Sequence, residues 1–261
     1  MEAIKYVLLG TGLSFFGTVL GSSIVFFYKS LNKKIERCCL GFAAGVMMAA
    51  SIFSLIIPSM NISTKAGDNA LIPVVTGLVL GGLFLLFLDR IIPHLHIGNN
   101  KPEGIKTKLE KSFLLVLAVT LHNIPEGMAV GVSFALASKT GDITLASAFA
   151  LAIGMCLQNI PEGAAVALPV KEATKNKKES FLLGSMSGIV EPIFGVITVL
   201  VVGIVSKLLP YFLSFAAGAM IYVIVEELIP ESIDNDGNSN IGVISFMVGF
   251  IIMLILDIAL G

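Results

Sequence analysis

Residues 120–131, TLHNIPEGMAVG, place a histidine, an amide and a carboxylate beside a proline within a long apolar run. On a helix, His122 lies four residues and Asn123 three residues before Glu126, so the three side chains share one face. Pro125 has no N–H group, so it kinks the helix and leaves the carbonyl four residues earlier without its helical donor. The stretch therefore predicts a kinked helix with a polar face.

The same motif occurs a second time in the next apolar run. Its copy, QNIPEG, repeats the arrangement, and a third acid precedes a proline in the run SGIVEPIFG; the residues concerned are Gln158, Asn159, Pro161 and Glu162, then Glu191. A single proline-kinked polar motif is often a structural hinge. Its duplication, with an acid at the same place in both copies, favours a functional site instead.

The composition is that of a membrane protein. Apolar residues make up 56% of the 261 residues, charged residues only 13%, and the mean hydropathy is +0.93. A soluble domain of this size needs far more charge on its surface. Runs of about 18 or more apolar residues can span a bilayer. The sequence predicts an all-α membrane protein, a single transporter domain over 1–261, with eight transmembrane helices: 4–28, 38–60, 71–92, 112–137, 143–169, 180–205, 209–230 and 241–260.

Several other features are expected to have no separate function. The run 4–28 is too long for a signal-peptide core and is predicted as the first span. The three cysteines form neither a disulfide framework nor a CxxC zinc motif, so they are predicted to be packing residues. No basic face suggests a nucleic-acid partner.

The basic residues predict the orientation. Loops after the first, third and fifth spans hold thirteen lysines and arginines, whereas the opposite side holds four. Under the positive-inside rule, both termini lie outside the cytoplasm. The seventh loop, on the side predicted to be cytoplasmic, is acidic and does not fit this orientation, but acidic residues contribute little to the rule. We expect a multi-pass protein of the cell membrane, that is, of the plasma or inner membrane.

An internal repeat is visible in the spans. FAAGVM (42–47) in the second span resembles FAAGAM (215–220) in the seventh, and LFLD closing the third at Asp89 resembles LILD closing the eighth at Asp257. The fourth and fifth spans share NIPEG. Within each pair the span numbers differ by an odd number (five, five and one). The two members of a pair therefore cross the membrane in opposite directions. This is typical of inverted-repeat transporters, whose substrates bind at mid-membrane.

The three acids require neutralisation. A carboxylate at the bilayer centre costs about 3 kcal/mol on the lowest scale, and no basic residue lies within the spans that carry Glu126, Glu162 and Glu191. Protons or bound cations are the candidates. Imidazole, carboxylate and amide oxygens form a mixed ligand set that suits borderline divalent ions such as zinc, iron or manganese. Seven ligand-capable side chains exceed what one four-coordinate zinc uses, so two ions sharing bridging glutamates is a hypothesis.

Two other function classes compete with metal transport. An intramembrane metalloprotease would need a histidine pair of the HExxH type, whereas only one histidine lies inside a span, so no enzyme is expected. A proton-coupled transporter of an organic solute would use the glutamates as proton carriers and remains the alternative. Zinc binding that is lost on His122→Ala would separate the two.

The paired NIPEG motifs, the eight spans and the EP in the sixth span resemble the ZIP (Zrt/Irt-like) family of divalent-metal transporters, in particular its GufA-like branch. The resemblance covers nearly the whole chain. It implies the ZIP-transporter fold, a binuclear metal centre, inward flux, a homodimer and an elevator-like movement of one helix bundle against the other. Zinc is the expected substrate, with iron, manganese and cadmium as further candidates.

The resemblance also implies residue roles. One metal would use His122, Glu126, Gln158 and Glu162, and the second would use Asn123, Glu126, Asn159, Glu162 and Glu191. Met47 resembles the thioether contact to the first metal, although Met48 could serve equally or either could be a core residue. Some relatives have an acid where this chain has Asn159, so the second site is expected to be weaker.

Further residues resemble those of the transport path. Ser54 would face the path by which the ion enters. His94 and His96 stand in PHLHIG, where many relatives carry a histidine-rich stretch; they could catch metal on the cytoplasmic side or be ordinary interfacial histidines. Glu226 and Glu227 resemble acids of the exit path, and helix-end solvation is the alternative.

Overall fold

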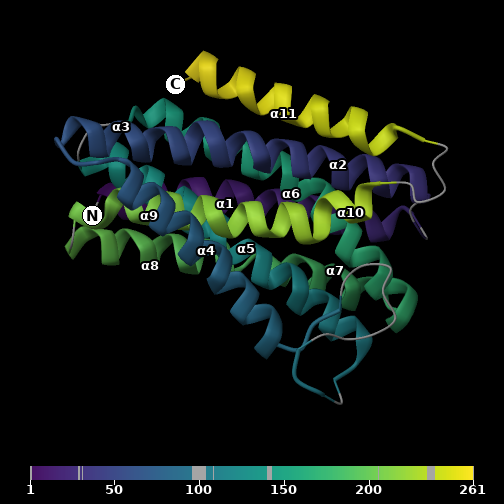
Figure 1. The fold of residues 1–261 in the computed structure, drawn as a ribbon. Coiled ribbons are helices and arrows are strands. Elements are labelled where there is room, and N and C mark those ends of the chain that lie inside the picture. Colours follow the sequence, from purple (N-terminus) through teal and green to yellow (C-terminus); the bar gives the residue numbers. More distant parts are fainter. Residues whose placement is uncertain are drawn as a thin grey trace.

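The computed structural model describes residues 2–28, 30, 32–95, 104–107, 109–139, 143–204, 206–233 and 239–260. In these residues, eight helical segments are long and apolar enough to cross a membrane, which confirms the predicted all-α membrane fold. Figure 1 shows them running roughly along one direction, with the N and C labels toward the same end, as an even number of spans requires.

The spans follow the sequence closely but are longer than predicted at several ends. In chain order the elements are α1 (Glu2–Ser22) with η1 (Ser23–Phe26); α2 (Lys33–Ala49), η2 (Ala50–Ile56) and α3 (Ile57–Lys65); α4 (Leu71–Ile91); α5 (Lys111–Lys139); α6 (Leu145–Thr174); α7 (Lys177–Ser187) and α8 (Val190–Ile204); η3 (Ser206–Leu208); α9 (Leu209–Val223), η4 (Ile224–Leu228) and α10 (Ile229–Ser232); and α11 (Ile241–Leu260).

The two helices that carry NIPEG lie at the centre of the molecule. In the apolar 18-residue stretch of α5 and of α6, 72% is buried inside the protein, against 22% for the stretch in α4 and 17% for that in α11. Figure 1 shows α11 at the outer edge of the structure. The apolar residues of α4 and α11 that face outward are suited to lipid, because lipid tails replace the protein interior as the apolar surroundings.

The predicted inverted repeat has a geometric counterpart. α2 packs along α11, and α9 packs along α4. A Cβ on Gly45 of FAAGVM would lie 2.0 Å from the carbonyl oxygen of Phe246, and one on Gly218 of FAAGAM would lie 2.2 Å from that of Leu78. The partner helices make the reciprocal contacts, Gly249 on the carbonyl of Phe42 and Gly81 on that of Phe215. The same small-residue packing therefore builds both helix pairs.

Two π-helical turns distinguish these helices from the regular spans that the sequence predicts. The turn η2 immediately precedes Ile57 and Pro58, and the turn η4 immediately precedes Ile229 and Pro230. A proline donates no hydrogen bond to the carbonyl four residues earlier, and a π turn reassigns the carbonyls of the preceding turn. The pair of π turns is a second feature that the two repeats share.

The sixth span contains an interruption that the sequence did not indicate. α7 ends at Ser187, a turn occupies Gly188 and Ile189, and α8 begins at Val190. Glu191 N–H still donates to the Gly188 carbonyl, at 3.1 Å, but Pro192 has no N–H with which to continue the pattern. The break therefore lies directly before the EP motif and exposes backbone carbonyls near it.

Candidate metal centre

The predicted ligands on α5, α6 and α8 form one buried polar cluster. Every side chain is at most 7% exposed, and Glu126, Gln158, Asn159 and Glu191 are completely buried. Glu162 and Glu191 both lie close enough to Glu126 to repel its charge. Hydrogen bonds join Glu126 to Gln158, Gln158 to Asn159, and Asn159 to Glu191. Glu162 lies near Glu126 and lines a cavity together with His122. With Asn123, which lies between His122 and Glu126 on α5, these are the seven buried side chains that the sequence singled out.

The glycine of each NIPEG motif allows this convergence. A Cβ on Gly127 would lie 2.5 Å from the carbonyl oxygen of Glu191, so α5 meets α8 at the acid itself. A Cβ on Gly163 would lie 2.3 Å from the carbonyl oxygen of Thr18, so α6 meets α1 at the equivalent place. Each motif thus carries its acid next to the residue that permits close helix packing.

Amide groups bridge the acids. Gln158 Nε2 donates to Glu126 Oε2 at 2.6 Å and also contacts Asn159 Oδ1. Asn159 Nδ2 donates to Glu191 Oε1 at 2.8 Å, to Ser14 Oγ at 2.9 Å and to the Ser14 carbonyl oxygen at 3.2 Å. The nitrogen of Asn159 is fully engaged, so its oxygen points toward Gln158.

The broken sixth span takes part in the cluster. Asn123 Nδ2 donates to the carbonyl oxygen of Ser187, at 3.1 Å, immediately before the turn that separates α7 from α8. This bond fixes the Asn123 amide and leaves its oxygen without a hydrogen-bond partner. The interruption before Pro192 is therefore part of the site.

Five buried oxygens of the cluster have no hydrogen-bond partner. They are Asn123 Oδ1, Glu126 Oε1, Gln158 Oε1, Glu162 Oε2 and Glu191 Oε2. All five are acceptors, and buried polar atoms normally find a partner. In the described residues no lysine or arginine interrupts the apolar part of α5, α6 or α8. A cation is the partner that satisfies several oxygens together.

The ligands are not yet arranged around one point. Among the described residues, no group of three His, Cys, Asp or Glu side chains is positioned to hold a metal ion. The amide nitrogen of Gln158 stands between two of the acceptors instead. Turning this amide over would present its unpaired Oε1 to the same acids.

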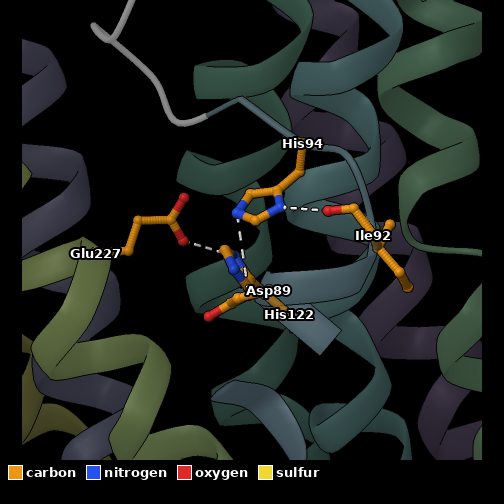
Figure 2. Close-up of polar contacts among 5 residues, drawn as sticks. All are labelled: Asp89, Ile92, His94, His122 and Glu227. Carbon is orange, nitrogen blue, oxygen red and sulfur yellow. Dashed lines mark hydrogen bonds and ion pairs between the residues drawn. The ribbon is translucent and has the colours of Figure 1, made fainter. Parts of the chain in front are cut away.

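His122 points toward η4, near the end of the seventh span. Its Nδ1 lies 2.8 Å from Glu227 Oε2, which belongs to the π turn η4 (Figure 2). Both side chains are nearly buried, and a cavity of about 20 Å³ adjoins them together with Glu162 and Glu231. A space of this size holds one water or one ion. The cavity therefore lies between the cluster and the segment η4–α10.

His94 is placed near the same end but has other contacts. Its Nδ1 lies 2.8 Å from the carbonyl oxygen of Ile92, and its Nε2 lies 4.0 Å from Asp89 Oδ1 (Figure 2). The ring is completely buried, which does not fit an ordinary interfacial histidine. Its partner in the motif, His96, lies outside the described residues.

The remaining predicted residues lie at varying distances from the cluster. Met47 is fully buried in the main hydrophobic core, and Met48 is partly buried against it. Ser54 donates to Asp257 Oδ1 at 2.9 Å. Glu226 is exposed, in contrast to its neighbour Glu227. Metal contact by these residues stays a prediction.

Ser14 in α1 accepts hydrogen bonds from Asn159 and was not predicted from the sequence. The sequence shows a stripe of small residues at helical spacing, of which these four lie against α6: Ser14, Gly17, Thr18 and Gly21. Such a stripe predicts close helix packing, but it does not reveal which polar group the serine meets. Asp257 was noted only for the repeat, and its bond to Ser54 was not foreseen.

Comparison with known proteins adds a separate finding. Residues 99–257 match the model of the family described as ZIP Zinc transporter. The chain is 33% identical to the human protein named Zinc transporter ZIP11, over 100% of this chain and 98% of that protein. It is 37% identical to Zinc transporter GufA of Myxococcus xanthus, over 94% of each. It is 37% identical to Zinc transporter ZIPB of Bordetella bronchiseptica, over 99% of this chain and 82% of that protein.

Proposed function

Because the chain belongs to the ZIP family of zinc transporters, we propose that it carries zinc across a membrane into the cytoplasm through the cluster on α5, α6 and α8. One observation supports this most strongly. Among the described residues, five buried acceptor oxygens from these helices lack hydrogen-bond partners, and no lysine or arginine lies among them. A dication satisfies this arrangement, whereas an organic anion would be repelled by it.

The cluster has ligands for two ions. His122, Glu126, Gln158 and Glu162 would hold the first, with Met47 as a further contact. Asn123, Glu126, Asn159, Glu162 and Glu191 would hold the second. The unpaired oxygens are divided between these sets, and both sets use Glu126 and Glu162 as bridges. The nitrogen of Asn159 donates to Glu191 and Ser14, so an ion in the second set would meet the oxygen of Asn159, which Gln158 Nε2 contacts in this structure.

Release toward the cytoplasm would follow the His122–Glu227 contact. When His122 binds zinc through one ring nitrogen, its contact with Glu227 orients the ring, as carboxylates do for histidine ligands. Glu227 then offers the next carboxylate on the way to the inner end. In this proposal both termini lie outside the cytoplasm, the protein sits in the cell membrane and it acts as a homodimer.

Uptake by proteoliposomes tests the function. Purified protein reconstituted into vesicles should accumulate zinc-65, with iron, manganese and cadmium as competitors and the pH gradient varied. Protein-dependent zinc accumulation supports the proposal. A protein that accumulates an organic solute but no transition metal would overturn it.

The His122→Ala variant is expected to lose tight zinc binding in the purified protein. Removal of a ligand imidazole should weaken the first site by roughly a hundredfold, since about 3 kcal/mol corresponds to that factor. Equilibrium dialysis with zinc-65 measures the effect. Leu121→Ala is the matched control, because it truncates the buried neighbour on the same helix and removes no ligand. Equal affinity in the two variants would rule out His122 as a ligand.

The Asn159→Asp variant is expected to strengthen the second site. It adds a negative charge beside Glu191 without a change in shape, and a charged acceptor binds a cation more tightly than a neutral one. The second zinc should bind about tenfold more tightly, which corresponds to about 1.4 kcal/mol. Dialysis at increasing zinc concentrations resolves the two steps. An unchanged second step would place Asn159 outside the metal centre.

A further inference from the structure

A large apolar groove lies apart from the polar cluster. It has a volume of about 610 Å³, within the range of about 300–1,000 Å³ that ligand pockets show. α1 and η1 with α6 form one wall, and α2 with α11 forms the other. Phe27, Phe42, Ile160, Pro161 and Val248 are among the side chains that line it. An apolar space of this kind does not retain water.

The groove opens at the end where α1 finishes and α2 begins. Phe27 and Ile35 line this end, and Leu20 and Val248 line the part that lies deeper in the spans. The orientation predicted from the basic loops places this end on the cytoplasmic side. The lining helices are themselves membrane spans, so the groove faces the hydrocarbon of the inner leaflet.

The mouth of the groove is surrounded by basic side chains. Lys33 and Lys34 are exposed in the first turn of α2, one turn ahead of Cys38 in the groove. The ammonium of Lys171 donates to the carbonyls of Val25 and Tyr28, at 2.9 and 2.6 Å, next to Phe27. The basic residues at this mouth are Lys33, Lys34, Arg37, Lys171 and Lys177.

Acidic residues at the same mouth do not cancel this charge. Glu36 lies near Lys33 and Arg37, and Glu172 is close enough to Glu36 to repel it. Among the described residues named here, two carboxylates thus face five basic groups, which gives them a net positive charge. The cytoplasmic leaflet contains anionic lipids, and basic pockets between helices on that side bind their headgroups.

We propose that this groove binds one anionic phospholipid, with an acyl chain between the two walls and the headgroup on Lys33 and Lys34. The apolar lining matches the chain, and the positive mouth matches the phosphate. Ile160 and Pro161 line the groove. Their neighbours in the sequence, Asn159 and Glu162, belong to the polar cluster. The lipid would therefore contact Ile160 and Pro161 of the second NIPEG motif.

Native mass spectrometry of the purified full-length protein tests the proposal. After incubation with equal amounts of dioleoyl phosphatidylglycerol and dioleoyl phosphatidylcholine, one phosphatidylglycerol per chain should survive gentle activation. The Val248→Trp variant fills the groove and should reduce this retention at least fivefold. Ile251→Trp is the matched control, since Ile251 is on the same helix, is 46% exposed against 45% for Val248, and does not line the groove. The Lys33→Gln, Lys34→Gln double variant should bind both lipids equally.

The outcomes separate the occupants of the groove. Equal retention of both lipids by the unmodified protein would overturn the anionic specificity, and unchanged retention in Val248→Trp would overturn the location. A second copy of the chain in the groove would appear as a dimer that Val248→Trp dissociates and Ile251→Trp does not, which also contradicts the proposal. None of these measurements requires zinc transport, so their result is independent of the proposed function.

Discussion

Zinc uptake is expected to fall to about 1% of normal when Glu126 is replaced by glutamine, and equally for Glu162. Both acids bridge the two proposed ions, so each substitution removes one charge from both sites at once. An interaction with a charged group is worth up to about 3 kcal/mol, or roughly a hundredfold in affinity. Glutamine keeps the shape of the side chain, and therefore the helix packing around it. Initial rates of zinc-65 uptake by proteoliposomes measure the effect.

The control for this experiment is Glu179→Gln. It is the same chemical change at an exposed acid in the first turn of α7, away from the cluster. This variant should transport zinc at the normal rate. Near-normal uptake by both Glu126→Gln and Glu162→Gln, with protein that elutes as a single species, would show that the acids are not part of the transport site.

Substitution of the FAAG glycines is expected to give the largest loss of stability. In Gly45→Ala and Gly218→Ala, the added methyl group would lie 2.0 and 2.2 Å from backbone carbonyl oxygens of the partner helix. Backbone cannot rotate away as a side chain can, so the helices must separate. Overpacking of this kind costs about 1–3 kcal/mol. Thermal unfolding in detergent, followed by loss of the monodisperse elution peak, should show a lower midpoint for each variant.

The Gly12→Ala variant is the control, for which we expect no loss of stability. Nothing lies within 4 Å of a Cβ at Gly12, and alanine favours a helix over glycine by about 1 kcal/mol. This variant should be as stable as the unmodified protein or more so. If Gly45→Ala and Gly218→Ala also left the midpoint unchanged, the close approach of the helix pairs would be wrong.

The sequence predicted the fold well because lipid simplifies the pattern. Every span must be apolar and helical, so hydropathy alone locates α4 and α11 almost to the residue. Interruptions of the helix within a span do not change its hydropathy, so hydropathy does not locate them. The π turns before Pro58 and Pro230 and the turn at Gly188 depend on how prolines redistribute backbone hydrogen bonds after the helices have packed.

For the site, the residue types were predictable and most of the contacts were not. The duplication of NIPEG identified the acids and amides, because charged groups at membrane depth are costly and therefore mark functional sites. The bond from Asn159 to Ser14 joins residues 145 positions apart, and a serine among glycines looks like packing. The pairing of His122 with Glu227 depends on the π turn that aims Glu227 inward. Helical periodicity contains no information of that kind.

The unpaired oxygens of the cluster have an energetic consequence for the cell. Among the described residues of the cluster the unpaired atoms are all acceptors, so they offer no donor to an accompanying anion such as chloride or phosphate. In the proposed inward transport, each passage moves two positive charges inward unless protons leave in exchange, and only the exit of two protons makes it electroneutral. A potential that is negative inside contributes about 2.3 kcal/mol per elementary charge for each 100 mV, and twice that for a dication. The resting voltage of the cell is therefore itself able to concentrate zinc, without any ATP hydrolysis by this chain.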